Sequence, residues 1–477
     1  MKNRTFKTYL AFSFILLAFN FSTSAQSALN EKTFYLSLED ALKEPDQVYR
    51  LDLTWQYMLD LPPEIGQFKN LEELNLGWNK LTILPKTILE LPKLKKLSLN
   101  NNPRLYLEKV VKQLMQIGSL QELSIGWNEM KMLPADIIGL QNLRSLQILC
   151  DSTIDLDKML YDLGNLKRLN EFSLRGNKLG RMSENLRYLI NLTHLDLSGN
   201  KIPELSPKIN RLKKLRVLNL QGNDLPELPL GITDLTDLHE LNLSNNKLIE
   251  IPARIGSFEN LEILNLSENS IEEVSNKLVN LKNLHYLDLS RNAIQELPSD
   301  FNEFSQLEYL DLSLNILVDI PLGIREIKSL STLKVSNNQG VNFLRFFKDV
   351  GGFVRLQELD ISANALDSLP VNISDISNLN TLNLSNNKLT FIADDFSKLS
   401  RLKTLALSGN DIRSIPVSIM QMPNLEVLNL DFNKIATIPD EIGQMSSLKE
   451  ISLRYNPIPE REIDKLQELL PNVKILR

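Results

Sequence analysis

The chain has 477 residues, of which 43% are hydrophobic, 23% are charged and 6% are aromatic, a balance typical of a folded, soluble protein. Its 53 basic and 59 acidic side chains give a formal net charge of −6, which disfavours nucleic acid or an anionic membrane as the main partner. A single cysteine, Cys150, excludes an internal disulfide.

The N-terminus has the pattern of a secretory signal. An apolar stretch at 9–21 follows three basic residues and precedes the small residues STSA at 22–25. We predict a signal peptide over residues 1–25, with cleavage after Ala25 or after Ala28 and an uncleaved anchor as the alternative. Loss of three basic residues would lower the net charge from −6 to −9. No cysteine lies near the cleavage point, so we expect a secreted or periplasmic protein without a lipid anchor.

Residues 26–47 are predicted to form an N-terminal cap. The segment 37–40 (SLED) resembles a capping box, which would open a short helix ending near Pro45. A solenoid exposes apolar surface at its ends, so such a cap keeps it soluble.

From residue 48 to 456 the phrase LxxLxLxxN returns about 18 times, as in LEELNLGWN, which ends at Asn79. Successive phrases end 23 residues apart, except for three steps of 26 residues. Sixteen of the 18 closing positions are asparagine, and the exceptions are Gln56 and Asp151. A constant period of this length indicates a stack of similar units. The closing asparagines, called the ladder below, are Asn79, Asn102, Asn128, Asn177, Asn200, Asn223, Asn246, Asn269, Asn292, Asn315, Asn338, Asn364, Asn387, Asn410, Asn433 and Asn456.

Each phrase predicts a short strand with one buried face. In residues 71–91, Leu74 and Leu76 alternate with Asn75, and a Leu-Pro step at 84–85 begins the return leg. The three 26-residue units lengthen this return leg. Their apolar residues recur at helical spacing and predict full helices over 107–117, 156–163 and 343–350. Four phenylalanines near the third helix (343, 346, 347 and 353) are expected in the core.

The chain ends in a predicted capping helix within 457–477, whose apolar face carries Ile463, Leu466, Leu469 and Leu470. No linker rich in Pro, Gly or Ser separates residues 48 and 477, so one continuous repeat domain is expected.

The repeated phrase resembles the leucine-rich repeats, in particular their 23-residue LPxxI type, which bacterial secreted proteins and Ras-group scaffolds share. The resemblance covers the chain from about residue 48 to its end. It implies an α/β solenoid: a right-handed horseshoe with a parallel sheet on the concave side and short α- or 3₁₀-helices on the convex side. It also implies that the ladder amides bond the backbone of neighbouring turns. The absence of cysteine-flanked caps makes the resemblance look bacterial rather than animal.

The first candidate binding surface contains every tryptophan. Trp55, Trp78 and Trp127 each lie one residue before the ladder position, and Tyr57 is nearby. Stacked repeats would place the three indoles in one column, suited to a protein ligand or to stacking on sugars. Alternatively, the rings pack on adjacent turns and serve only the fold.

The second candidate surface lies in the middle of the array. The residue before the central strand leucine is Ile263, Tyr286 and Tyr309 in three successive repeats, with Leu314 close by. An apolar strip among Ser and Asn residues is typical of a protein contact. β-Branched and aromatic residues are also good strand formers, so the strip has a structural explanation too.

No catalytic constellation is evident. The three histidines lack partners at metal-ligand spacing, Cys150 is expected to be a buried small residue, and no hydrolase, metalloprotease or phosphate-binding motif occurs. We therefore expect a non-enzymatic, monomeric recognition protein without cofactor or metal. Its expected ligand is a protein or peptide on the concave face, and the alternative is a carbohydrate on the tryptophan column.

Overall fold

The structure is a computed structural model that describes residues 34–477, except 127, 129–131, 150–153, 253, 349–351, 370 and 393. The predicted signal peptide, Trp127 and Cys150 lie outside the described residues. The chain forms two compact units: an N-terminal unit up to Glu129 together with Pro134–Leu143, and a C-terminal unit of Met130–Leu133 and Arg144–Arg477.

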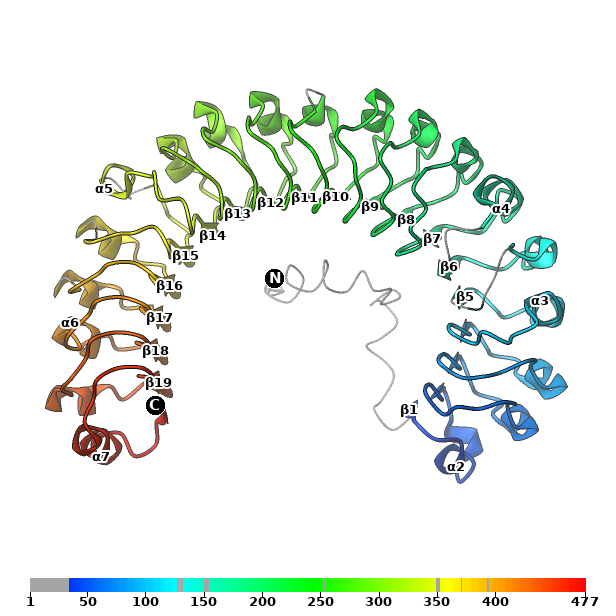
Figure 1. The fold of residues 1–477 in the computed structure, drawn as a ribbon, viewed down its shortest axis with the longest axis horizontal. Helices are drawn as coiled ribbons and strands as arrows, with labels where there is room; N and C mark the ends of the chain where they lie inside the picture. Colours follow the sequence, from blue (N-terminus) through cyan, green and yellow to red (C-terminus); the bar gives the residue numbers. More distant parts are fainter. Residues whose placement is uncertain are drawn as a thin grey trace, which may run out of the picture. The chain divides into compact units, whose positions relative to one another are not determined.

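In the N-terminal unit, five strands pair in parallel and in chain order (Figure 1). From β2 to β4 each residue lies beside the residue 23 positions later, as Leu51 does with Leu74. The sheet register is therefore the sequence period. The strands are β1 (Phe34–Tyr35), β2 (Arg50–Asp52), β3 (Glu73–Asn75), β4 (Lys96–Ser98) and β5 (Glu122–Gly126).

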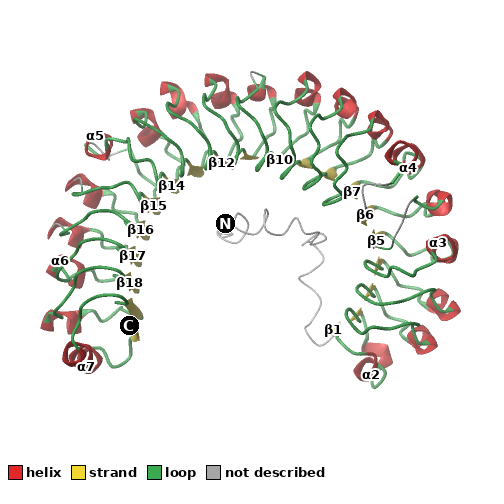
Figure 2. Cartoon of the chain, in the orientation of Figure 1, coloured by secondary structure: helices red, strands yellow, loops and turns green. Residues whose placement is uncertain are grey.

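In the C-terminal unit, fifteen strands continue the same pattern, and Figure 2 shows them along the inner side of an arc with the helices outside. They are β6 (Ser145–Leu149), β7 (Glu171–Ser173), β8 (His194–Asp196), β9 (Val217–Asn219), β10 (Glu240–Asn242), β11 (Ile263–Asn265), β12 (Tyr286–Asp288), β13 (Tyr309–Asp311), β14 (Thr332–Lys334), β15 (Glu358–Asp360), β16 (Thr381–Asn383), β17 (Thr404–Ala406), β18 (Val427–Asn429), β19 (Glu450–Ser452) and β20 (Lys474–Leu476). Neighbours in this order pair in parallel.

The return legs carry short helices. The α-helices are α2 (Leu38–Ala41), α3 (Leu107–Leu114), α4 (Leu156–Leu163), α5 (Phe343–Phe346), α6 (Val417–Met420) and α7 (Glu460–Leu469). The 3₁₀ helices span Pro45–Gln47, Pro63–Gln67, Lys86–Glu90, Ala135–Gly139, Glu184–Tyr188, Pro207–Arg211, Leu230–Asp234, Ile255–Ser257, Asn276–Asn280, Ser299–Glu303, Leu322–Glu326, Val371–Asp375, Asp394–Lys398 and Asp440–Gln444. None of the helices among these described residues is long and apolar enough to cross a membrane.

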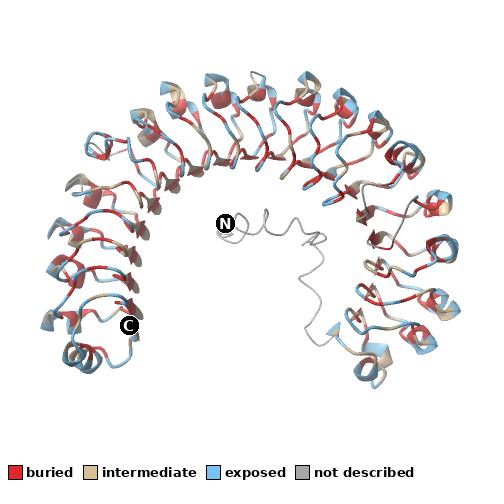
Figure 3. Cartoon of the chain, viewed as in Figure 1, coloured by how far each residue is buried: buried red, intermediate tan, exposed pale blue. Residues whose placement is uncertain are grey.

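Leucines from the strand and the return leg form the core of each repeat. Leu284, Leu287 and Leu289 are fully buried, and so is Ile294 on the outgoing turn. Figure 3 shows buried residues recurring in this way in every repeat of both units. The parallel sheet and the short helices confirm the predicted α/β solenoid.

The structure differs from the predicted elements at four places. The helix expected over 107–117 ends at Leu114, with its C-cap at Met115. The helix expected over 343–350 is a single turn that ends at Phe346, because Phe347 has left the helical conformation at φ −90° and ψ 9°. The phenylalanines around it are buried, as predicted. Two short strands at the ends, β1 and β20, were not predicted, and they pair with β2 and β19.

Candidate functional site

In most strands, two side chains point outward, one on either side of a buried central residue that is usually leucine. In β12 these are Tyr286 and Asp288, which flank the buried Leu287. Because adjacent strands pair in register, the outward residues form rows across the sheet. Ile263, Tyr286 and Tyr309 are consecutive members of one row, as the sequence predicted.

The two tyrosine rings stack on each other. Their centroids lie 4.3 Å apart and their planes differ by 9°. Tyr286 is only 8% exposed, whereas Tyr309 and Ile263 are half-buried. The accessible part of this surface is therefore Tyr309 and Ile263, with Tyr286 as the layer between them.

Two carboxylates lie beside the stacked rings. The Tyr309 hydroxyl donates to Asp311 Oδ2 at 3.1 Å, and the Tyr286 hydroxyl lies 3.5 Å from Asp288 Oδ2. Burial, together with the adjacent Asp311 carboxylate, raises the pKa of Asp288 to about 6. Burial and the two carboxylates also raise the pKa of both tyrosines, which keeps their hydroxyls protonated. The Lys334 ammonium lies 5.3 Å from the centroid of the Tyr309 ring.

The tryptophan surface is described for two of its three indoles. Trp55 and Trp78 stack with centroids 4.2 Å apart and planes 14° apart. They are 55% and 36% exposed. Tyr57 is also exposed, and the Lys80 ammonium lies 5.6 Å from the centroid of its ring. Ring faces and edges in this column are thus open to solvent.

Backbone conformation distinguishes the position before the ladder. Every described residue at this position has a positive φ, between 53° and 72°. Glycine adopts this left-handed conformation readily, whereas a bulky side chain is strained by it. Glycine meets this requirement at Gly176, Gly199 and Gly222. Large side chains occupy the same position in five other repeats despite the strain, at Trp55, Trp78, Leu314, Phe432 and Tyr455. Strain of this kind points to a role for the exposed side chain.

The pair Phe432 and Tyr455 was missed by the sequence interpretation. Their rings stack 4.2 Å apart, and both are more than half exposed. Arg454 and Asp431 form an ion pair at 3.3 Å next to them, in a position where half of the 18 repeats carry serine. The sequence signal was present: two aromatics 23 residues apart, in the same position as the tryptophans.

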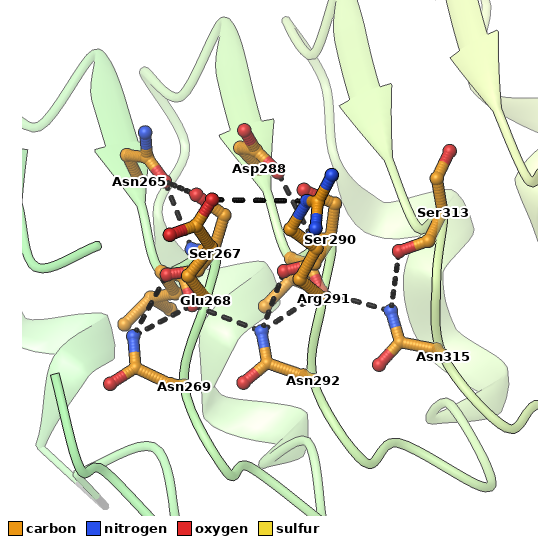
Figure 4. A network of polar contacts seen from close by, with 12 residues as sticks. Asn265, Ser267, Glu268, Asn269, Asp288, Ser290, Arg291, Asn292, Ser313 and Asn315 are labelled. Atoms are coloured by element: carbon orange, nitrogen blue, oxygen red, sulfur yellow. Dashed lines mark hydrogen bonds and ion pairs between the residues drawn. The ribbon is translucent and has the colours of Figure 1, made fainter. Parts of the chain in front are cut away.

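The ladder joins consecutive turns (Figure 4). Asn292 Nδ2 donates to the carbonyl oxygens of Leu266 and Leu289, each at 3.0 Å, and its Oδ1 accepts from the Ile271 amide at 3.1 Å. Asn269 and Asn315 repeat these bonds in the neighbouring turns. The ladder thus supplies partners to backbone groups that would otherwise be buried and unpaired.

Metal-binding chemistry is not assembled in the part of the chain that the structure describes. No group of three or more His, Cys, Asp or Glu side chains there could hold a metal ion. His239 and His285 each direct Nδ1 to a backbone carbonyl two residues earlier, at 2.6 Å. Both rings thus have a backbone partner directly before a strand, β10 and β12 respectively.

Comparison with known families finds leucine-rich repeats along the chain. A model described as leucine rich repeat matches residues 46–103, 354–412 and 400–458, and a leucine-rich repeat region model matches 255–372. A two-copy repeat model and a single-repeat model match 190–230 and 237–258. No curated protein sequence matches the chain.

Solved structures share the fold. A leucine-rich repeat protein of Leptospira interrogans is 32% identical, with 93% of this chain and 99% of that chain covered and a TM-score of 0.56. TLR13 in complex with ssRNA13 is 21% identical, with 90% and 68% covered and a TM-score of 0.68. The ectodomain of the Arabidopsis thaliana receptor kinase GASSHO1/SCHENGEN3, in complex with CASPARIAN STRIP INTEGRITY FACTOR 2, is 24% identical, with 90% and 58% covered and a TM-score of 0.54. At these identities, the last two show the fold alone.

Proposed function

This chain belongs to the leucine-rich repeat family, and from that premise we propose that it is a non-enzymatic recognition protein that binds a protein or peptide on its strand-lined face. We place it in a secreted or periplasmic setting, after removal of residues 1–25, and as a monomer. The net charge of −9 that this removal would leave favours a protein or peptide over nucleic acid as the ligand.

The observation that carries this proposal is the strip formed by Ile263, Tyr286 and Tyr309. Three apolar or aromatic side chains stand in register on adjacent strands, between Glu240 and Thr332 in the same row. Aromatic side chains that are already packed lose little conformational entropy on binding, so they are effective anchors for a protein ligand. The carboxylates of Asp288 and Asp311 add hydrogen-bond acceptors beside the strip.

Side-chain replacements taken from the same row test the proposal. Thr332, Thr381 and Thr404 occupy this row elsewhere, so a double variant Ile263→Thr/Tyr309→Thr removes the strip but keeps a residue that the fold already accepts. The mature chain from Gln26 is used to capture ligands from extracellular extract, and the affinity of each captured protein is then measured. We expect the double variant to lose affinity by about ten-fold or more.

The matched control is Val427→Thr, which makes the same kind of change in the same row but outside the strip. It should bind as tightly as wild type. Equal affinity of wild type, control and double variant would remove the strip as the binding site.

The exposed stack of Trp55 and Trp78 favours carbohydrate binding as a second candidate function. Aromatic faces stack on sugar rings, and two of the three tryptophans report on this site. Neutral oligosaccharides that bind here should quench tryptophan fluorescence, and Trp55→Gly/Trp78→Gly should abolish the change. A captured protein that binds without any fluorescence change would favour the strip instead.

A further inference from the structure

Another surface, distinct from those described above, lies on the helix-bearing side of the C-terminal unit. There, the return legs of three successive repeats line an open hollow of about 620 Å³. Its lining residues come from the end of α4 and from the two following 3₁₀ helices and their exits: Tyr161, Gly164, Asn165, Lys167, Arg187, Tyr188, Ile190, Lys208 and Arg211. A hollow of this size is within the range of small-molecule sites.

The lining is cationic, although the protein as a whole is acidic. Four of the nine lining residues are lysine or arginine, and none is acidic. The surrounding segment, residues 158–216, contains thirteen basic and five acidic residues, whereas the whole chain has a net charge of −6. Positive charge is thus concentrated on these repeats, and the field inside a concave site concentrates further.

Two of the cations are available to a ligand. Lys208 and Arg211 are exposed, and their side chains make no hydrogen bond or ion pair with any residue that the structure describes. The other two are oriented by their surroundings. Arg187 lies 3.7 Å from Glu184 and donates to the Tyr188 hydroxyl at 3.1 Å, and Lys167 donates to the Gly164 carbonyl at 2.7 Å.

Aromatic and apolar side chains complete the walls. The rings of Tyr161 and Tyr188 meet edge to face with centroids 5.4 Å apart, and the Arg187 guanidinium lies 4.9 Å from the Tyr188 centroid. Ile190 is half exposed beside them. Gly164 permits this packing, because a Cβ there would lie 2.7 Å from the Cβ of Tyr188.

We propose that this hollow binds a sugar-sized ring that carries phosphate or sulfate groups. Guanidinium and ammonium groups from separate turns match several oxyanions on one ligand. The tyrosine rings and Ile190 offer an apolar wall for the ring itself. The site is separate from the strand-lined face, and its ligand is independent of the function proposed above.

Calorimetric titration of the mature chain tests the proposal. The probes are myo-inositol hexakisphosphate, a sulfated heparin tetrasaccharide and, as the uncharged reference, myo-inositol. We expect binding of at least one anionic probe with a Kd of about 100 µM or tighter, weakening as salt is added, and no binding of myo-inositol. The tighter of the two anionic probes identifies the oxyanion as phosphate or sulfate.

Charge-removing variants locate the binding. Lys208→Gln/Arg211→Gln should weaken it by about ten- to one-hundred-fold, because charge-assisted hydrogen bonds are lost. Tyr161→Ser should weaken it by about three- to ten-fold without changing the thermal midpoint. The control Lys388→Gln/Arg413→Gln removes two exposed cations elsewhere in the same unit, whose side chains also make no hydrogen bond or ion pair with a described residue. It should bind like wild type.

The proposal would be overturned if neither anionic probe bound, or if the Lys208/Arg211 variant and the control lost the same affinity. Vesicles that contain phosphatidylglycerol are tested as a further probe, and binding to them alone would also overturn it. That result would assign the cations to a membrane surface instead.

Discussion

Two regions of the C-terminal unit use the same backbone position in opposite ways. Gly176, Gly199 and Gly222 precede the ladder in three successive repeats, whereas Phe432 and Tyr455 stand there near the end of the chain. All five adopt a left-handed φ, so the fold requires the same backbone conformation in both regions. Glycine adopts this conformation without strain, whereas each aromatic residue is destabilised in it by about 1–2 kcal/mol.

The fold thus imposes the left-handed conformation at this position, whereas the identity of the side chain varies with the surface that it forms. If packing alone chose the residue, glycine or asparagine would recur throughout. The stacked rings of Phe432 and Tyr455, like those of Trp55 and Trp78, offset part of the strain by their contact. Each of these four residues is nevertheless more than a third exposed. Exposed, strained aromatics are therefore the residues to examine for binding.

The largest effect should come from removing the ladder in each region. Asn200→Ala and Asn433→Ala each leave one backbone amide without a partner. Each also removes one of the two ladder hydrogen bonds that two backbone carbonyls accept. We expect a loss of about 3 kcal/mol of local stability in both. Hydrogen exchange of the Asn177 and Ile412 amides, which donate to these two side chains, measures the loss. A much smaller effect at Asn433 would mean that the aromatic region holds its turns by other contacts.

A smaller, pH-dependent effect is expected at Asp288. Its pKa of about 6 in the folded chain exceeds the ordinary value of about 3.9, so the folded state binds the proton more tightly and this contribution to stability falls as pH rises from about 4 to about 6. Asn242 and Asn265 occupy the same row and accept the same backbone bond, so Asp288→Asn should fold. We expect the variant to exceed wild type by about 1–2 kcal/mol at pH 7.5 and to equal it near pH 4.

Thermal unfolding at both pH values measures this difference. Asp360→Asn is the matched control, because its neighbours in the row are Lys334 and Asn383 rather than a second carboxylate. An equal gain in the control at pH 7.5 would exclude Asp311 as a cause of the effect at Asp288.

The smallest effects test the strain itself. Gly199→Ala meets no backbone atom closer than 3.6 Å, so its cost should be the left-handed φ alone, about 1 kcal/mol. Phe432→Gly should change stability by less than about 1 kcal/mol, because relief of strain offsets the lost ring contact. Calorimetric midpoints check both, and a large loss for Phe432→Gly would make the ring structural rather than a surface for binding.

Much of the fold could be predicted because it is local and repeated. The alternation around Leu74 predicts the strand, and the 23-residue step predicts both the sheet register and the ladder. Both predictions are possible because each turn contacts mainly the turns before and after it. The terminal strands β1 and β20 escaped prediction because two or three residues without the repeat phrase carry no periodic signal. For the candidate surfaces, the sequence predicted which residues occupy equivalent positions in neighbouring repeats, but not how their side chains stack or how far they are buried.

The positions that point inward can be read from the repeat period, because burial of leucine at a fixed period leaves one register for the sheet. The combination of outward side chains becomes visible only in the folded chain, since stacking and burial depend on neighbours one turn away. Thus Tyr286 lies buried against Tyr309, and Phe432 pairs with Tyr455. Likewise, Tyr161, Tyr188 and Arg211 line one hollow because three return legs bring together residues up to 50 positions apart in the sequence.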